Sequence, residues 1–294
     1  MFLIVGANGF LGNYFLKNIL EKTDDNILAT DINLQDNYQD KRINWVSCDI
    51  TKIEDLQNIN NLTKNEKDLK VIFLSAYHKP DLVLQNPKIA WNVNVIALAN
   101  FLNIMDNIKV MYYPSTEVVY GEGIEGHKFN EEDKLNPINK YGEHKTIAER
   151  MVNVAGFNVV RFPVLMGASL IPNKKHFYDE IVETVKAGNT TEMFEDSFRS
   201  FIDFDTVAKV VLELINNPEA QKYKIVNIAG DEALSKYELG VRIAEKHNLD
   251  KSKIIPISMD KDKKIFTAKR SKETLLDNSL VKKILGLKEL KIKI

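Results

Sequence analysis

The sequence predicts an α/β fold in which a doubly wound parallel sheet precedes a smaller C-terminal α/β lobe. Short apolar runs alternate with longer segments of helical periodicity. This alternation needs crossover connections, which place helices on both faces of a parallel sheet. Near-continuous apolar runs such as 71–75 fit strands that are buried on both faces. The alternation becomes less regular after Pro163, where we expect the second lobe to begin.

The first half of the chain supplies most of the sheet. In segment 10–22 the apolar residues recur at helical spacing on one face. The segment from residue 87 starts with a proline, which is tolerated in the first turn of a helix. The expected strands are 2–5, 27–30, 44–47, 71–75, 110–114 and 157–162, and the expected helices are 10–22, 54–63, 87–105 and 139–155.

The second half has weaker periodicity and opens with a loop over 166–175. Ser235 and Glu238 have the spacing of a capping box, which predicts a helix that runs from there to His247. The other expected elements are helices over 177–187, 206–215 and 274–287 and strands over 201–202 and 224–228. We assign residues 1–165 to the first domain, with a stretch around 200–230 returning to it, and residues 166–294 mainly to a substrate-binding lobe.

The composition is that of an ordinary soluble globular protein, with 294 residues, 44% of them hydrophobic and 28% charged. A net charge of −1 gives no electrostatic case for binding nucleic acid or an anionic membrane. The single cysteine, Cys48, excludes an intramolecular disulfide framework and fits a reducing cytoplasm, where we expect the protein. No set of His, Cys, Asp or Glu has metal-site spacing, so we expect no required metal.

Gly6, Gly9 and Gly12 mark a turn from a strand into a helix, which is the pattern of a Rossmann dinucleotide site. The first glycine allows a tight turn, the second lets the backbone approach pyrophosphate, and the third lets the helix pack on the strand. Asp31 ends the second strand, where a carboxylate can hold the ribose hydroxyls of NAD(H) and would repel the 2′-phosphate of NADP(H). We expect NAD(H), with NADP(H) possible. An Asp31 that only caps a turn is compatible with the same sequence.

Other expected cofactor contacts follow from the topology alone, because they lie where the third and fourth strands end or beside that edge. The full expected set is Gly6, Asn8, Gly9, Phe10, Leu11, Gly12, Asp31, Asp49, Ile50, Ser75, Ala76, Tyr77, Asn94, Tyr141, Lys145 and Pro163.

Tyr141 and Lys145 are four residues apart, so they share a helix face. A tyrosine needs a lowered pKa to exchange protons near neutral pH, and an ammonium beside an oxidised nicotinamide would lower it. Alone, this spacing usually means a solvated helix face. The segment Ser115-Thr116-Glu117 supports a catalytic role, because it brings a hydroxyl to the carboxyl edge of the sheet, where open α/β folds bind ligands.

With these residues in place, the chain resembles the extended short-chain dehydrogenases/reductases that act on nucleotide-linked sugars. It is most similar to the dTDP-4-dehydrorhamnose reductase-like branch, and the resemblance covers essentially the whole chain. The matching pieces are the Gly6-Gly9-Gly12 turn, Asp49-Ile50, Asn94-Val95, segment 116–121, the Tyr141 and Lys145 pair, Arg161-Phe-Pro163, and segments 199–205, 235–239 and 270–277.

The resemblance implies that Thr116 polarises the substrate oxygen, that Tyr141 is the general acid or base, and that Lys145 is its electrostatic partner. In the reductive direction NADH gives hydride to the keto carbon of the sugar while Tyr141 protonates the oxygen. Asn94 braces the active-site helix or is purely structural. The expected contacts of the nucleotide-diphosphate sugar are His78, Glu117, His176 and Arg199; a guanidinium suits a diphosphate, although Arg199 in a surface ion pair is equally compatible.

Two departures from the family narrow the expected activity. The 4,6-dehydratases carry an Asp-Glu pair after the threonine, where this chain has Glu117 and Val118, so we do not expect dehydration. Cys48 lies on the adenine side and cannot serve as the cysteine of bifunctional epimerases. We expect a homodimeric reductase of a 4-keto nucleotide sugar that supplies a surface polysaccharide or glycoconjugate pathway. A 4-epimerase with tightly held NAD and a non-catalytic cofactor-binding regulatory subunit are the alternatives.

Overall fold

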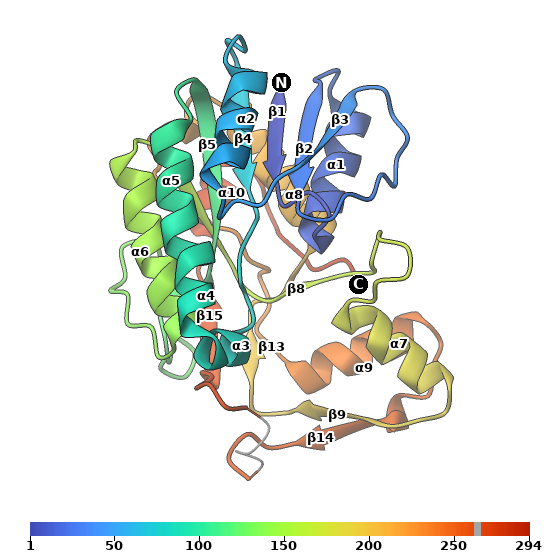
Figure 1. Cartoon of the computed structure of the whole chain (residues 1–294). Helices are drawn as coiled ribbons and strands as arrows, with labels where there is room; N and C mark the ends of the chain where they lie inside the picture. The colour runs from blue at the N-terminus through green and yellow to red at the C-terminus, as the bar shows by residue number, and fades with distance from the viewer. Residues whose placement is uncertain (262–265) are drawn as a thin grey trace.

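A seven-stranded parallel sheet forms the centre of the molecule (Figure 1). The computed structural model describes residues 1–261 and 266–294. The strand order is β12-β7-β5-β4-β1-β2-β3, and every neighbouring pair is parallel. The order reverses beside β1, which confirms the doubly wound α/β architecture. The strands are β1 (Phe2–Val5), β2 (Ile27–Asp31), β3 (Ile43–Ser47), β4 (Leu69–Phe73), β5 (Ile108–Thr116), β7 (Asn158–Phe162) and β12 (Ile225–Asn227).

Helices cover both faces of this sheet, and strand alternation supplies a core to each face. Phe2 and Ile4 of β1 pack in the core beneath one set of helices, whereas Leu3 and Val5 pack in the core beneath the other. The first face carries α1 (Phe10–Lys22), α8 (Phe204–Ile215) and α10 (Ser279–Leu285), and the second carries α2 (Ile53–Thr63), α5 (Ala97–Ile104) and α6 (Lys140–Val154).

A smaller lobe lies beyond the carboxyl edge of the sheet, in the lower part of Figure 1. Its core joins two helices to a two-stranded parallel sheet, with Ile181, Ile243 and Met193 buried between them. The lobe comprises α7 (Phe177–Lys186), α9 (Lys236–Lys246), β9 (Thr191–Phe194) and β14 (Ile254–Ile257). Ser235 and Glu238 form the expected capping box at the start of α9.

Short strands connect this lobe to the large sheet. They form a four-stranded sheet in the order β13-β10-β15-β6 and a separate β11–β8 pair. The strands are β6 (Lys128–Phe129), β8 (Leu165–Met166), β10 (Phe198–Arg199), β11 (Ile202–Asp203), β13 (Leu234–Ser235) and β15 (Glu273–Leu276).

Two of the expected helices differ from the structure. Segment 87–105 is not one α-helix, because a π-helical stretch (Asn92–Ile96) separates α4 (Pro87–Trp91) from α5, and a further short helix, α3 (Pro80–Gln85), precedes it. The tail 274–287 begins as β15, a buried strand, and only its second part is helical, as α10. No helix in residues 1–261 and 266–294 is long and apolar enough to cross a membrane.

Candidate active site

The glycine turn follows β1 at the carboxyl edge of the sheet. Gly6 has a φ of +90°, and a Cβ there would lie 2.8 Å from the backbone nitrogen of Ser75, so this position requires glycine on both counts. A Cβ on Gly12 would overlap the carbonyl of Ala7, because α1 packs directly on the turn. Gly9 is the N-cap of α1 and provides no side-chain cap. The first N–H groups of α1 are therefore available to an anion.

Asp31 lies where β2 ends and is tied to the glycine turn. Its Oδ2 accepts a hydrogen bond of 3.0 Å from the backbone N–H of Asn8, and the Asn8 side chain donates to the carbonyl of Asn33. Two of the expected cofactor contacts, Asn8 and Asp31, are thus held side by side. Phe10 and Leu11 follow in the first turn of α1.

Asn94 lies in the π-helical stretch and holds the segment after β4 by hydrogen bonds to Tyr77. Its Oδ1 accepts from the backbone N–H of Tyr77 at 2.8 Å, and its Nδ2 donates to the Tyr77 carbonyl at 3.0 Å. Asn94 is buried, and Tyr77 alone provides hydrogen-bond partners for both the oxygen and the nitrogen of its side-chain amide. The segment Ser75-Ala76-Tyr77 is therefore fixed beside Gly6.

The remaining expected cofactor contacts lie at strand ends. Asp49 caps its own loop by accepting from the backbone N–H and hydroxyl of Thr51, which lowers the pKa of its carboxyl. Ile50 is buried in the core beside Cys48, where burial raises the pKa of the thiol to about 12. Pro163 follows β7 and is buried.

The start of α6 packs closely against the end of β5. A Cβ on Gly142 would lie 2.9 Å from the carbonyl of Val118 and 2.8 Å from the Cβ of Pro137. The absence of a side chain at Gly142 therefore lets the first turn of α6 reach the turn that begins at Thr116. Asn139 caps this helix by accepting from the Gly142 N–H at 3.0 Å.

Tyr141 is half-buried, and its environment favours the protonated phenol. Desolvation raises the pKa of Tyr141 well above its usual value, and the negative charge of Glu117 raises it further. The protein's own groups therefore favour the phenol over the phenolate, and a phenolate would need further positive charge from a bound molecule.

Lys145 lies one turn further along α6 and is 4% exposed. Its Nζ donates to the hydroxyl of Tyr113 at 2.8 Å and to the carbonyl of Pro114 at 2.5 Å. Desolvation lowers the pKa of Lys145 to about 7, and the charge of Glu149 only partly offsets it.

Thr116 and Glu117 are joined to the small lobe through Arg199. The Thr116 hydroxyl donates to Glu117 Oε2 at 3.2 Å, and Glu117 Oε1 lies 3.5 Å from Arg199 Nε. Burial raises the pKa of Glu117, against the lowering effect of Arg199. The Nη groups of Arg199 donate to the carbonyls of Phe198, Ser271 and Lys272 and to the Ser271 hydroxyl.

The expected substrate contacts fall into separate places. His78 is exposed to solvent, but neighbouring protein atoms still desolvate its ring. This desolvation lowers the pKa of His78, and the positive charges of Lys79, Lys174 and Lys145 lower it further. His176 caps α7, and its ring packs edge-on against Phe10 at 5.0 Å between centroids. The structure therefore brings His176 to the glycine turn, and Glu117 and Arg199 to Thr116.

A buried ion pair behind the site was missed by sequence reasoning. Arg161 Nη2 donates to Glu149 Oε2 at 2.7 Å and Nε donates to Oε1 at 3.0 Å. Ser115 also donates to Glu149 Oε1, and Tyr120 accepts from Arg161 Nη1 at 2.6 Å. The sequence signals were the helical spacing that places Glu149 one turn after Lys145 and the family match at Arg161, and neither predicted that the two residues pair.

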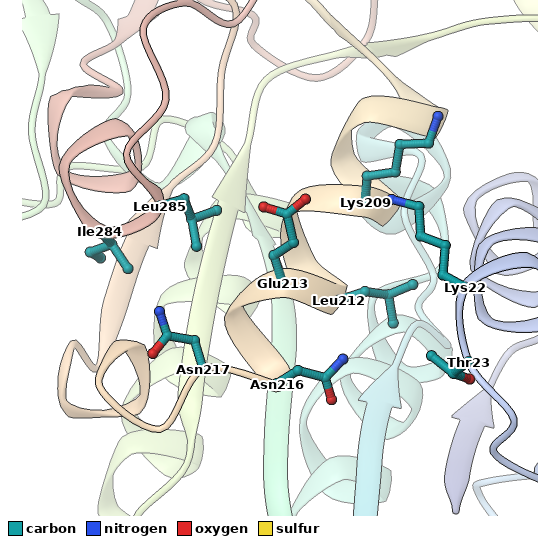
Figure 2. Close-up of a pocket in the computed structure, with 9 residues that line it drawn as sticks. All are labelled: Lys22, Thr23, Lys209, Leu212, Glu213, Asn216, Asn217, Ile284 and Leu285. Atoms are coloured by element: carbon teal, nitrogen blue, oxygen red, sulfur yellow. The ribbon is translucent and has the colours of Figure 1, made fainter.

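Two hollows are lined mainly by other residues. One of about 370 Å³ opens at the opposite edge of the sheet, between the ends of α1, α8 and α10, where Figure 2 shows Lys22, Lys209 and Glu213 among its lining side chains. The other, of about 600 Å³, lies beside the start of α6 and is lined by Ile138, Phe194, Phe266, Arg270 and other residues. Arg270 donates to Asp81 of α3 at 2.6 Å, so this second hollow adjoins the segment that carries His78.

Within the described ranges, no group of three or more His, Cys, Asp or Glu could hold a metal ion.

Comparison with known proteins agrees with this geometry. The family model described as RmlD substrate binding domain matches residues 1–293. Methionine adenosyltransferase 2 subunit beta of Xenopus tropicalis is 26% identical over 292 residues, covering 96% of this chain and 81% of that protein. The probable low-salt glycan biosynthesis reductase Agl14 of Haloferax volcanii is 25% identical over 246 residues, covering 82% and 78%.

Among solved structures, the dTDP-4-dehydrorhamnose reductase of Bacillus anthracis in complex with NADP has a TM-score of 0.79 at 20% identity, over 99% of this chain and 94% of that one. This similarity confirms the Rossmann-like reductase fold. It also places the glycine turn and the Tyr141 helix within a fold that holds a nicotinamide dinucleotide in that relative.

Proposed function

Because the chain belongs to the RmlD substrate binding domain family, we propose that it is an NAD(H)-dependent reductase of a 4-keto nucleotide-linked sugar. The observation that carries the proposal is the close packing of the start of α6 against the turn that follows Thr116, which brings Tyr141 near Glu117 at the carboxyl edge of the sheet. Desolvation and Glu117 both favour its phenol form, and a phenol is the form that can protonate a developing alkoxide.

The described residues fit a nicotinamide dinucleotide. Gly6 and Gly12 allow the close approaches of the turn, the amino terminus of α1 has no side-chain cap, and Asp31 is held beside Asn8. When bound, NADH supplies a hydride to the keto carbon. Tyr141 gives its proton to the substrate oxygen, and Lys145 places a positive charge near the phenol.

Thr116 and Glu117 orient the substrate in this proposal. The Thr116 hydroxyl donates its single proton to Glu117, so polarising the keto oxygen, the role that the resemblance implies for it, would require this hydrogen bond to be redirected to the substrate. With the bond to Glu117 kept, the lone pairs of Thr116 can accept from a sugar hydroxyl. We assign Arg199 mainly to Glu117, because both of its Nη groups are already used by backbone carbonyls. A direct contact between Arg199 and the diphosphate would require those hydrogen bonds to rearrange. His78 and His176 are further proposed substrate contacts.

The first test is NADH consumption, followed by absorbance, against a panel of 4-keto nucleotide sugars, with NADPH in parallel. Consumption with one sugar would support the reductase and identify the nucleotide. A protein that consumes no NADH but retains NAD⁺ through purification would instead indicate a 4-epimerase, because that reaction uses the same proton donor and returns the hydride to the substrate.

A regulatory role is the second candidate, and the similarity to methionine adenosyltransferase 2 subunit beta favours it. A non-catalytic subunit has no need for an intact Thr116, Tyr141 and Lys145 set, which all lie at one edge of the sheet here. Co-purification with a methionine adenosyltransferase catalytic chain, together with no turnover on the sugar panel, would support the subunit over the reductase.

We expect Asp31→Asn to shift cofactor use toward NADPH. The amide keeps an oxygen for the Asn8 N–H but removes the charge that would repel a 2′-phosphate. The ratio of kcat/KM for NADPH to that for NADH should rise by about tenfold or more. Asp36→Asn, a charge change in the loop beyond β2, is the matched control and should leave the ratio unchanged. An unchanged ratio in Asp31→Asn would show that Asp31 only caps the turn.

We also propose that the protein is a homodimer. Large apolar side chains are exposed on the helical run from α3 to the π-helical stretch, including Ile89 at 55% and Trp91 at 42% exposure. Val154 at the end of the neighbouring α6 is 90% exposed. Light scattering should give twice the chain mass, and Ile89→Glu should give a monomer. A wild-type monomer at micromolar concentration would exclude the dimer.

A further inference from the structure

The hydroxyl of Tyr113 is a polar group in an otherwise apolar part of the core. Tyr113 is 2% exposed and packs with Phe73, whose ring centroid is 6.3 Å from its own. Its Oη lies 2.8 Å from Lys145 Nζ, and the same Nζ lies 4.0 Å from the centre of the Tyr113 ring. The ring and the hydroxyl therefore both contact the ammonium.

We propose that Tyr113 is a positioning residue, which holds the ammonium of Lys145 charged and in place so that one remaining N–H can serve the reaction. Nζ of Lys145 has three N–H groups, and in residues 1–261 and 266–294 its acceptors are Tyr113 Oη and the Pro114 carbonyl. Two fixed N–H groups determine the direction of the third. This inference depends on the proposed function, because it gives Lys145 a part in binding the dinucleotide and in tuning Tyr141.

Both acceptors of Lys145 come from β5, so the strand that ends at the catalytic Thr116 also holds the lysine. A flexible four-carbon side chain would otherwise need to be ordered when the ligand binds. A hydrogen bond from an ammonium is roughly twice as strong as one from a neutral amine. The Tyr113 hydroxyl and the Pro114 carbonyl, which both accept from Nζ, therefore favour the charged form of Lys145. Of these two acceptors, only the Tyr113 hydroxyl belongs to a side chain and can be removed by substitution.

The charged groups around Lys145 come from three elements. Glu149 on α6 favours the charged form, and desolvation disfavours it. Burial raises the pKa of Tyr141, also on α6, and that of Tyr113 on β5, so both phenols stay neutral. Desolvation by the surrounding protein lowers the pKa of His78, which follows β4. Removing the Tyr113 hydroxyl thus takes from the ammonium one of its two acceptors and should make Lys145 lose its proton at lower pH.

The test is Tyr113→Phe, which keeps the ring and removes only the hydroxyl. Lys145 is titrated directly by NMR in lysine-labelled apoprotein, with its signal assigned by Lys145→Arg. We expect its midpoint to move to lower pH in the variant. NADH affinity, followed by fluorescence, should be close to wild type at pH 6 and about tenfold weaker at pH 8.5, because a hydrogen bond to a charged group is worth about tenfold.

Tyr112→Phe is the matched control, since Tyr112 is the adjacent buried tyrosine of β5 and lies in the core on the opposite face of the sheet. It should leave both the Lys145 midpoint and the pH dependence of NADH binding unchanged. An unchanged Lys145 midpoint in Tyr113→Phe would overturn the proposal, as would a loss of affinity that is equal at every pH. A wild-type protein that binds no NADH would refute the proposed function instead, while the NMR titration would still test the positioning of Lys145.

Discussion

Tyr141→Phe is expected to lower kcat for NADH-dependent reduction by about 10²–10⁴-fold, which is the usual contribution of a positioned acid. The phenol is the group whose environment favours the protonated form, through desolvation and the charge of Glu117. Phenylalanine keeps the ring that packs at the start of α6 and removes the proton. The Kd for NADH should stay within a small factor of wild type, because neither the glycine turn nor Asp31 is altered.

Steady-state and single-turnover measurements of NADH oxidation would check this expectation. Tyr237→Phe, a tyrosine in the first turn of α9, is a suitable control and should retain activity. If Tyr141→Phe turned over at the wild-type rate, Tyr141 would not be the acid. Glu117 would then be the group to test next, because burial raises its pKa and it accepts directly from the Thr116 hydroxyl.

The cofactor end of the molecule could be predicted from sequence because its requirements are local. The spacing of Gly6 and Gly12 reflects a positive φ, a close backbone approach and tight helix packing, and the structure shows these features. Likewise, the long apolar runs of the first half predicted a buried parallel sheet, and the structure confirms it. Each of these properties is encoded within about twenty residues of chain.

Interactions between distant segments could not be predicted in the same way. Lys145 and Tyr113 are 32 residues apart, and Glu117 meets Arg199 only after the chain has formed the small lobe. Alternation along β5 predicts that Tyr112 and Tyr113 face opposite sides, but not which hydroxyl reaches a helix residue. The tail was partly mispredicted for a related reason, since β15 is a strand only because β6 and β10 lie beside it.

Several charged side chains are buried on or next to α6, the helix that carries Tyr141 and Lys145, and burying a charge is costly. Lys145, Glu149, Arg161, Glu117 and Arg199 are each at most 6% exposed. Such groups are tolerated only when each has a partner, and here Glu149 serves Arg161 while it also favours the charged form of Lys145. The ion pair therefore connects α6 to β7.

Breaking this ion pair is the second change for which we expect a large effect. Glu149→Gln leaves the Arg161 guanidinium buried without its counter-charge, although the amide can still accept one hydrogen bond. The free energy of unfolding should fall by about 3–5 kcal/mol, which is the typical result of removing one partner of a buried pair. Urea denaturation followed by circular dichroism would measure it. Glu219→Gln is the matched control, because Glu219 pairs with Lys222 at the surface and its replacement should leave the free energy of unfolding nearly unchanged.

A double replacement separates the cost of an unpaired charge from the value of the pair itself. In Glu149→Met with Arg161→Met no buried charge is left alone, so we expect much of the stability lost in Glu149→Gln to return. The Ser115 and Tyr120 hydroxyls would lose their ionic partners in this variant, which keeps the recovery incomplete. A double variant less stable than Glu149→Gln would show that the pair stabilises the fold in its own right. Recovery of stability without recovery of turnover would instead indicate that the carboxylate is retained for Lys145, whose charge it supports.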